Sequence, residues 1–215
     1  MTSKKDLDII IEKEEEQIAE KIFSELEPYF KGILALDVKS KELQLFKENY
    51  NYFVHKFAEK LEVFSNLLIF KDVPISDIRG QLTLLFGYLG TVESIGNAIV
   101  DFLVILLVAN GIDFHIERKY RTPTIKHATL IRELEKDRVS LGTKLNFLRD
   151  NNIKTVPLII DNELRNSIAH LNFTLKEKRI YIKGQDAILL VGNASRKLSF
   201  LIGLIFGSLL FDTKM

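Results

Sequence analysis

The sequence predicts an all-α helical bundle with a small β-hairpin inserted before the last helix. Apolar residues recur at helical spacing over most of the chain, two short strand-like segments lie close together near residue 178, and a long apolar segment follows them. The 215 residues are enough to bury a sizeable core. We therefore expect a single helical domain over residues 1–215.

Composition narrows the possible functions. The 30 Lys and Arg residues balance 29 Asp and Glu residues, so RNA binding would need a local basic patch rather than a global field. The chain has no cysteine, which excludes disulfides, thiolate metal sites and cysteine nucleophiles. No metal-ligand motif and no nucleotide-binding glycine loop occurs, so we expect no metal and no cofactor.

The charge pattern and the length of the apolar runs favour a cytoplasmic protein. The first residues lead into a charged helix and not into an apolar secretory core. Residues 98–109 and 198–211 are apolar, but both runs are shorter than the roughly 20 residues of a membrane-spanning helix. We expect both to be core helices and the protein to have no membrane contact. A less favoured alternative is a peripheral membrane protein that uses residues 198–211.

Two helices are expected in the first 70 residues. The first covers residues 6–26, and Pro28 is expected to end it, because proline lacks the N–H that continues a helix. The second has apolar residues at steps of three and four, which is the spacing of one helix face. Its inward stripe is Phe46, Tyr50, Phe53, Phe57, Leu61, Phe64 and Leu68.

A long helical region is expected over residues 76–110. Gly87 and Gly90 are the positions where it is expected to bend or break. Asp101 lies inside its apolar part, so this carboxylate needs a partner. We expect that Asp101 bonds a hydroxyl or amide of a neighbouring helix, or lines a pocket.

The C-terminal half is expected to hold three more helices and the hairpin. One helix covers residues 124–149. Another begins at Pro157, whose fixed φ suits a first helical turn, and ends near Leu171. Residues 173–182 then form the hairpin, and the last helix starts near Asp186 as its cap.

The helix that ends near Leu171 carries the most informative segment of the chain. Projected at helical spacing, its inward stripe is Leu164, Ile168 and Leu171. The opposite face carries Arg165, Asn166, Ala169 and His170. An imidazole moves a proton near neutral pH and a guanidinium holds a phosphate, so His170 and Arg165 together suit phosphodiester cleavage. The small Ala169 would let another surface approach.

This face resembles a known family motif. Arg165-Asn166, followed by Ala169 and His170, is similar to the R-x4-6-H signature of the HEPN superfamily in its R-N-x-x-A-H form. The resemblance implies a small helical bundle at about residues 75–211, on which the N-terminal helices of residues 1–70 would pack. It also implies a metal-independent ribonuclease whose site forms across a homodimer.

The resemblance further implies a role for each motif residue. The RNA 2′-hydroxyl would attack the adjacent phosphate, with His170 as general base or acid, Arg165 binding the phosphate, and Asn166 orienting either group. The family also contains inactive members, so the runner-up is a binding or dimerisation module. An example would be the partner of a nucleotidyltransferase, or of an antitoxin, in a toxin–antitoxin or defence system.

A structural reading of the same residues stays open. Arg165 would then pair with a carboxylate such as Asp161 or Glu163, and Asn166 would bond a neighbouring helix. His170 would simply terminate its helix, where the macrodipole favours it.

The densest basic segment of the chain covers residues 113–132. Five of its residues are expected to contact RNA, with the tyrosine stacking on a base: Arg118, Lys119, Tyr120, Arg121 and Lys126. The alternative is a solvated loop and helix start, whose charge is offset by nearby glutamates.

Overall fold

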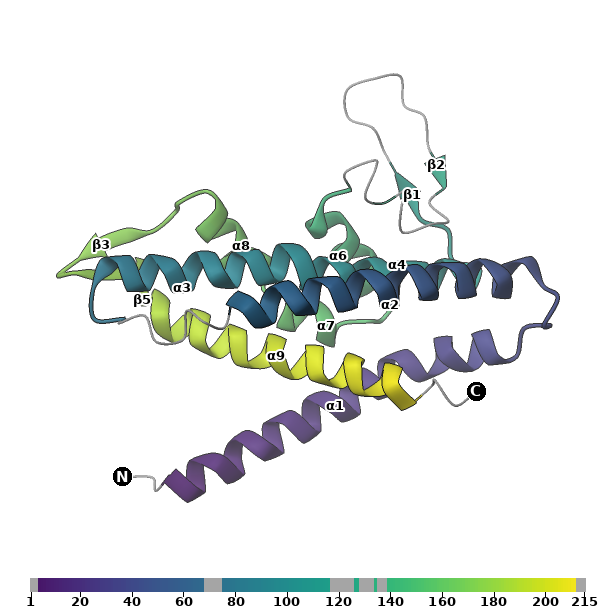
Figure 1. The fold of residues 1–215 in the computed structure, drawn as a ribbon, viewed down its shortest axis with the longest axis horizontal. Helices are drawn as coiled ribbons and strands as arrows, with labels where there is room; N and C mark the ends of the chain where they lie inside the picture. The colour runs from purple at the N-terminus through teal and green to yellow at the C-terminus, as the bar shows by residue number, and fades with distance from the viewer. Residues whose placement is uncertain (1–3, 68–74, 117–125, 128–133, 135–138, 212–215) are drawn as a thin grey trace.

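The chain is mostly helical, which confirms the predicted fold class. The computed structural model describes residues 4–67, 75–116, 126–127, 134 and 139–211. Long helices pack along one another, and a small three-stranded antiparallel sheet precedes the last helix (Figure 1).

The first helix, α1 (Lys4–Leu34), runs through Pro28, so the predicted end at this residue is wrong. Contacts beyond the proline hold the helix in place. The Tyr29 hydroxyl donates to a backbone carbonyl at Asn151 (2.6 Å), and the Tyr29 carbonyl accepts from the Asn110 amide (3.0 Å). These tertiary bonds offset the N–H that the proline removes.

The Asn110 side chain lies directly against the backbone of α1. A Cβ atom at Gly32 would stand 2.0 Å from the Asn110 Oδ1 atom. Only a glycine at this position lets the two elements approach so closely.

The second helix, α2 (Lys41–Leu67), packs on α4 with its predicted aromatic stripe. Phe53 and Phe57 are buried, and the Phe53 ring stacks on Phe102 with the ring centroids 4.6 Å apart. The described aromatic residues of the stripe therefore serve packing and not base stacking.

A continuous helical rod follows, made of α3 (Ile78–Thr91), the π-helical turn η2 (Val92–Gly96) and α4 (Asn97–Ala109). The predicted irregularity at Gly87 and Gly90 is wrong, because both residues lie within regular α-helix. The departure begins two residues after Gly90, in η2.

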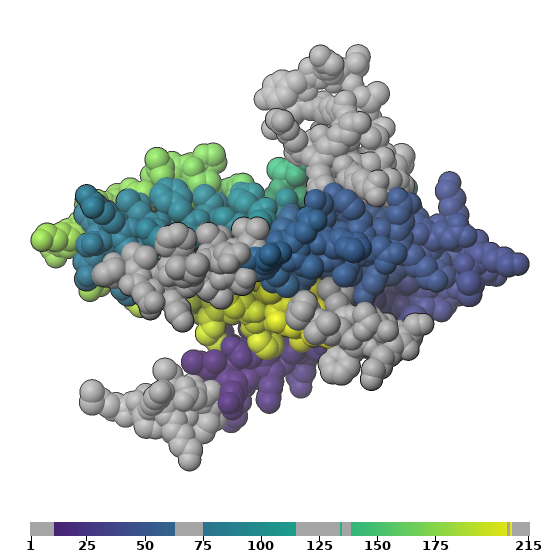
Figure 2. Space-filling view, viewed as in Figure 1, coloured from purple at the N-terminus to yellow at the C-terminus, as the bar shows by residue number. Residues whose placement is uncertain are grey.

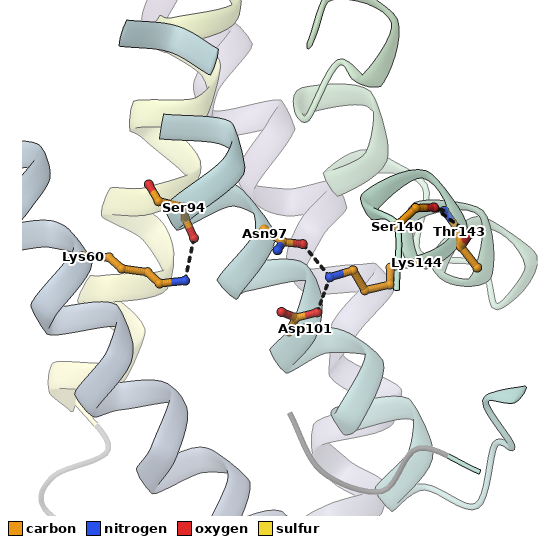
Figure 3. Close-up of polar contacts among 7 residues, drawn as sticks. All are labelled: Lys60, Ser94, Asn97, Asp101, Ser140, Thr143 and Lys144. Carbon is orange, nitrogen blue, oxygen red and sulfur yellow. Dashed lines mark hydrogen bonds and ion pairs between the residues drawn. The ribbon is translucent and has the colours of Figure 1, made fainter. Parts of the chain in front are cut away.

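The π-helical turn receives a bond from another helix. A π-turn disturbs the regular ladder of backbone hydrogen bonds. The Lys60 ammonium on α2 donates to the carbonyl of Ser94 within η2 at 3.0 Å (Figure 3). This contact ties α2 to the point where the rod changes its winding.

The predicted helix over residues 124–149 is only partly correct. Strands β1 (His115–Ile116) and β2 (Lys126–His127) pair antiparallel, so residues 126–127 are not helical. Helix α6 (Leu141–Asp150) begins after Ser140, whose hydroxyl accepts a first-turn N–H at 3.1 Å. This cap fixes the start of α6.

The predicted helix from Pro157 to the motif is two helices, α7 (Thr155–Ile159) and α8 (Asn162–Ala169). Asp161 starts the second one, because its carboxylate accepts a first-turn N–H at 2.9 Å. The Glu25 carboxylate of α1 holds the start of α7 by accepting from its first backbone N–H (2.9 Å). Two separate caps thus replace the single start that the proline suggested.

The predicted hairpin is present as β3 (Thr174–Lys176) and β4 (Arg179–Ile182). A third strand that was not predicted, β5 (Gln185–Asp186), pairs with β4. The last helix, α9 (Ala187–Phe211), starts directly after Asp186, as predicted. The Asp186 carboxylate accepts the N–H two residues further on at 2.9 Å.

Two helical stretches are long and apolar enough to cross a membrane by length and composition. Ile78–Ala109 has a mean hydropathy of 2.0, and 78% of its apolar window is buried in the protein, as for a core helix. Ala187–Ile205 has a mean hydropathy of 1.5 and is 28% buried. It lies between α3 and the N-terminal part of α1 on the face shown in Figure 2.

A buried ion pair joins α4 and α6 within the core. The Lys144 Nζ atom lies 2.5 Å from the Asp101 Oδ1 atom and 2.5 Å from the Asn97 Oδ1 atom (Figure 3). The side chains of Lys144 and Asp101 are 2% and 3% exposed. Asp101 is therefore buried beside a partner, as expected, and this partner is an ammonium, which the sequence analysis had not considered.

We predict that Lys144 and Asp101 are strongly coupled in their effects on the free energy of unfolding. Lys144→Met leaves the buried Asp101 carboxylate without its ammonium, so it should lower the free energy of unfolding by about 3–5 kcal/mol. Adding Asp101→Asn should recover part of that loss, because no charge then stays buried. Urea unfolding of both single variants and the double variant measures the coupling.

The exposed Lys154 offers a matched control, since Lys154→Met should change stability little. A double variant whose loss equals the sum of the two single losses would contradict the coupling.

Candidate functional site

Helix α8 presents the predicted motif face outward. Leu164 and Ile168 pack into the core, as expected. The opposite face is half-buried or exposed along its length and carries Arg165, Asn166, Ala169 and His170. The face that resembles the family motif is thus accessible in the protein.

Leu171 does not belong to the inward stripe, so this part of the prediction is wrong. Its side chain is 60% exposed, and its φ of 55° lies in the left-handed region. The N–H groups of Asn172 and Leu171 donate to the carbonyls of Ser167 and Ile168, which is the Schellman pattern of a helix end. The chain turns sharply after His170 as a result.

The Arg165 guanidinium is held in place by two side chains. Its Nε and Nη2 atoms contact the Glu93 carboxylate of η2, and its Nη1 atom donates to the Asn166 Oδ1 atom at 2.6 Å. These contacts use three of the five N–H donors of a guanidinium. Among the described contacts, two donors remain for a ligand, while Glu93 offsets much of the charge.

The acidic neighbours of Arg165 in the sequence have other roles. Asp161 caps α8, and Glu163 pairs with Lys183 from the turn between β4 and β5 at 2.6 Å. The hydrogen bond from the Lys183 ammonium holds the pKa of the Glu163 carboxyl below its ordinary value. The expected pairing of Arg165 with a carboxylate therefore exists, but its partner comes from another helix.

A polar pocket of about 380 Å³ opens beside the start of the motif. Its less polar lining residues are Val139, just before α6, and Leu141 and Gly142 at the start of α6. The polar residues that line it are Glu93, Asn97, Ser140, Asn162, Arg165 and Asn166. The pocket thus joins three separate parts of the chain, which are η2 with α4, α6, and α8.

The structure brings two of the three predicted catalytic residues together at this pocket. Arg165 and Asn166 line it, whereas His170 does not. His170 stands one turn further along α8, where its backbone N–H donates to the Asn166 carbonyl at 3.0 Å, and it is exposed. Within one copy of the chain, Arg165 and Asn166 therefore line the pocket, whereas His170 lies outside it.

Sequence analysis missed the pocket residues of the central rod. The two missed residues, Glu93 and Asn97, follow one another at an interval of four and precede Asp101, already singled out, by a further four, within a largely apolar segment. Such spacing places polar groups on one face of a helix, and this was the available signal. Lys144 had a similar signal, because it lies three residues after Leu141 and four before Leu148, on the helix face that these leucines share.

The predicted basic RNA-binding segment is not brought to this pocket by any described contact. Its members Arg118, Lys119, Tyr120 and Arg121 lie outside the described residues. Lys126 lies in β2, where it pairs with Ile116. A role of this segment in RNA binding stays a prediction.

Within the described part of the chain, no group of three or more His, Asp or Glu side chains is placed to hold a metal ion. The chain matches no protein-family model, no curated protein and no solved structure.

We predict that the end of the motif helix is strained at Leu171. A non-glycine residue in the left-handed region costs on the order of 1 kcal/mol. Leu171→Gly should therefore raise the free energy of unfolding by up to about 1 kcal/mol, measured by chemical denaturation.

Leu175 is equally exposed at 60% but lies in strand β3, outside the left-handed region. Leu175→Gly should destabilise the protein. An equal loss in both variants would show that Leu171 carries no strain.

Proposed function

We propose that the protein is a metal-independent endoribonuclease of HEPN type. The observation that carries the proposal is the outward motif face, on which Arg165 and Asn166 line a polar pocket and His170 is accessible at the helix end. A guanidinium with two unused donors suits a phosphate, and an exposed imidazole suits proton transfer near neutral pH.

In the proposed reaction the RNA 2′-hydroxyl attacks the neighbouring phosphorus. A histidine takes the 2′-hydroxyl proton as the new P–O bond forms. Arg165 stabilises the charge that develops on the phosphate oxygens. The bond to the 5′-oxygen then breaks, a second proton donor protonates this oxygen, and a 2′,3′-cyclic phosphate remains on the upstream fragment.

A homodimer would supply the second proton donor. In one copy of the chain, His170 lies outside the pocket that Arg165 lines, so a single copy presents an incomplete site. A two-fold axis through the exposed motif face would bring two copies of Arg165 and His170 together. Ala169 would permit the close approach.

A second candidate function is a binding or dimerisation module without catalysis. The Glu93–Arg165 contact favours it, since this carboxylate offsets the charge that a phosphate would need. The partner would then be a protein, such as an antitoxin or nucleotidyltransferase in a toxin–antitoxin or defence system.

We predict that the protein cleaves a structured RNA in the presence of EDTA and leaves 2′,3′-cyclic phosphate ends. DNA should stay intact because it lacks the 2′-hydroxyl. His170→Ala should lower the cleavage rate by about 10²–10⁴-fold, because it removes the proton carrier. Arg165→Ala should also lower the rate, through lost charge stabilisation. Gel analysis of labelled RNA measures each rate.

His55→Ala and Arg79→Ala are matched controls, because both residues are exposed on other helices. Neither control should slow cleavage. Cleavage that needs added Mg²⁺, or a His170→Ala variant as active as wild type, would refute the proposal.

We also predict that the protein is a dimer through the motif face. Ala169→Arg places bulk and like charge at the centre of that interface, so light scattering at micromolar concentration should show a shift from dimer to monomer. Ala58→Arg changes an exposed alanine of α2 and should leave the dimer intact. A wild-type monomer at this concentration would contradict the two-copy site.

A further inference from the structure

We propose that residues 4–21 of α1 form an acidic arm that covers a basic and apolar face of α9, and that this face binds an anionic lipid surface when the arm moves away. None of the residues involved belongs to the motif or to the pocket beside Arg165. The arm and the nuclease site are therefore separate features of the protein.

The arm is only lightly packed against the protein. None of residues 11–21, the part of the arm whose burial the structure describes, is buried, whereas Ile22, Leu26 and Ile33 further along α1 belong to the core. In Figure 1 the arm runs obliquely past α9, and its first turns lie apart from the other helices. Because most of the stability of a helix comes from the packing of its apolar face, the arm can detach at small cost while the rest of α1 stays in place.

Ion pairs hold the arm on α9. The Glu14 carboxylate contacts the Arg196 guanidinium at 2.5 Å and the Lys197 ammonium at 3.1 Å, and Glu15 contacts Arg196 at 3.2 Å. The hydrogen bond from Arg196 is the main cause that holds the pKa of the Glu14 carboxyl below its ordinary value. All four side chains are partly exposed, between 29% and 39%, and ion pairs in that setting contribute little to stability.

The face of α9 that meets the arm combines these two cations with apolar residues. Four half-buried apolar residues lie three or seven positions from Lys197, on the same side of the helix: Leu190, Ala194, Phe200 and Leu204. The mean hydropathy is 1.5 over Ala187–Ile205, yet only 28% of this stretch is buried in the protein. A helix that joins accessible apolar residues to Lys and Arg is suited to lie in the surface of an anionic bilayer.

An anionic lipid surface matches the charge of the arm that it would replace. Residues 11–21 hold five glutamates and two lysines, so the arm is acidic. Anionic headgroups can take the place of the glutamates at Arg196 and Lys197, and each cation near such a surface adds to the attraction. The long stems of both side chains can then lie along the apolar face while their charged ends stay among the headgroups. The expected absence of membrane contact would describe the protein with the arm in place.

The test is flotation of the full chain with lipid vesicles of two compositions, phosphatidylcholine alone and phosphatidylcholine with about one-quarter phosphatidylserine. The double variant Glu14→Gln, Glu15→Gln frees Arg196 and Lys197 without adding a cation. It should bind the phosphatidylserine vesicles about tenfold or more tightly than wild type does, with no gain on the neutral vesicles. Adding Arg196→Gln and Lys197→Gln should remove that gain.

The double variant Glu27→Gln, Glu59→Gln is the matched control. It removes the same two negative charges and frees two exposed lysines, Lys31 on α1 and Lys56 on α2. This control should bind both kinds of vesicle as wild type does. Circular dichroism and urea unfolding show whether each variant is folded. If the variant that changes both arm glutamates does not fold, Glu15→Gln alone, which keeps both contacts of Glu14, should still give a smaller gain.

Three results would overturn the lipid-binding face. The first is the absence of any gain when the arm glutamates are replaced. The second is a gain that persists without Arg196 and Lys197, or that the control shows equally. The third is an equal gain on neutral vesicles, which would favour an apolar protein partner for α9 instead.

Discussion

The buried contact between Lys144 and Asp101 is the constraint on which the pocket depends. An ammonium and a carboxylate within the core are stable there only when they face each other closely and further hydrogen bonds satisfy their remaining donors and acceptors, as Asn97 does for Lys144. This requirement fixes how α6 lies against α4. Since Ser140, Leu141 and Gly142 begin α6 about one turn before Lys144, the same contact brings these three residues to the pocket that Asn97 also lines.

The π-helical turn supplies the other half of the arrangement. Glu93 lies within η2, Asn97 directly follows it, and Asp101 comes one turn later. The three side chains lead in order from Arg165 at the rim, through the pocket, to Lys144 in the core. Lys60 bonds a carbonyl of the same turn from α2, so the turn is fixed from the side away from the pocket as well.

Much of the fold was predictable because helical spacing and turn residues act locally. The stripe of α2, the hairpin after α8 and the start of α9 follow from residues close together in the sequence. The errors arose where distant residues decide the outcome. Helix α1 continues past Pro28 because Asn110 and Asn151 bond Tyr29, and α7 begins where Glu25 caps it. Likewise, the motif face was predicted from its own helix, whereas the partners that Glu93 and Lys144 contact, Arg165 and Asp101, are set by tertiary packing.

The contact between Arg165 and Glu93 bears directly on the phosphate binding that we propose for Arg165. Both side chains are partly exposed, at 24% and 39%, and an ion pair in that setting contributes about 1 kcal/mol or less. A phosphate that replaces Glu93 as a partner of the guanidinium therefore costs the protein little folding stability. Meanwhile Glu93 and Asn166 keep the planar group oriented beside the pocket before any ligand arrives, so less side-chain freedom is lost on binding. A weak, partly exposed carboxylate partner is thus compatible with a phosphate-binding arginine, whereas a buried partner such as the one that Lys144 has would not be.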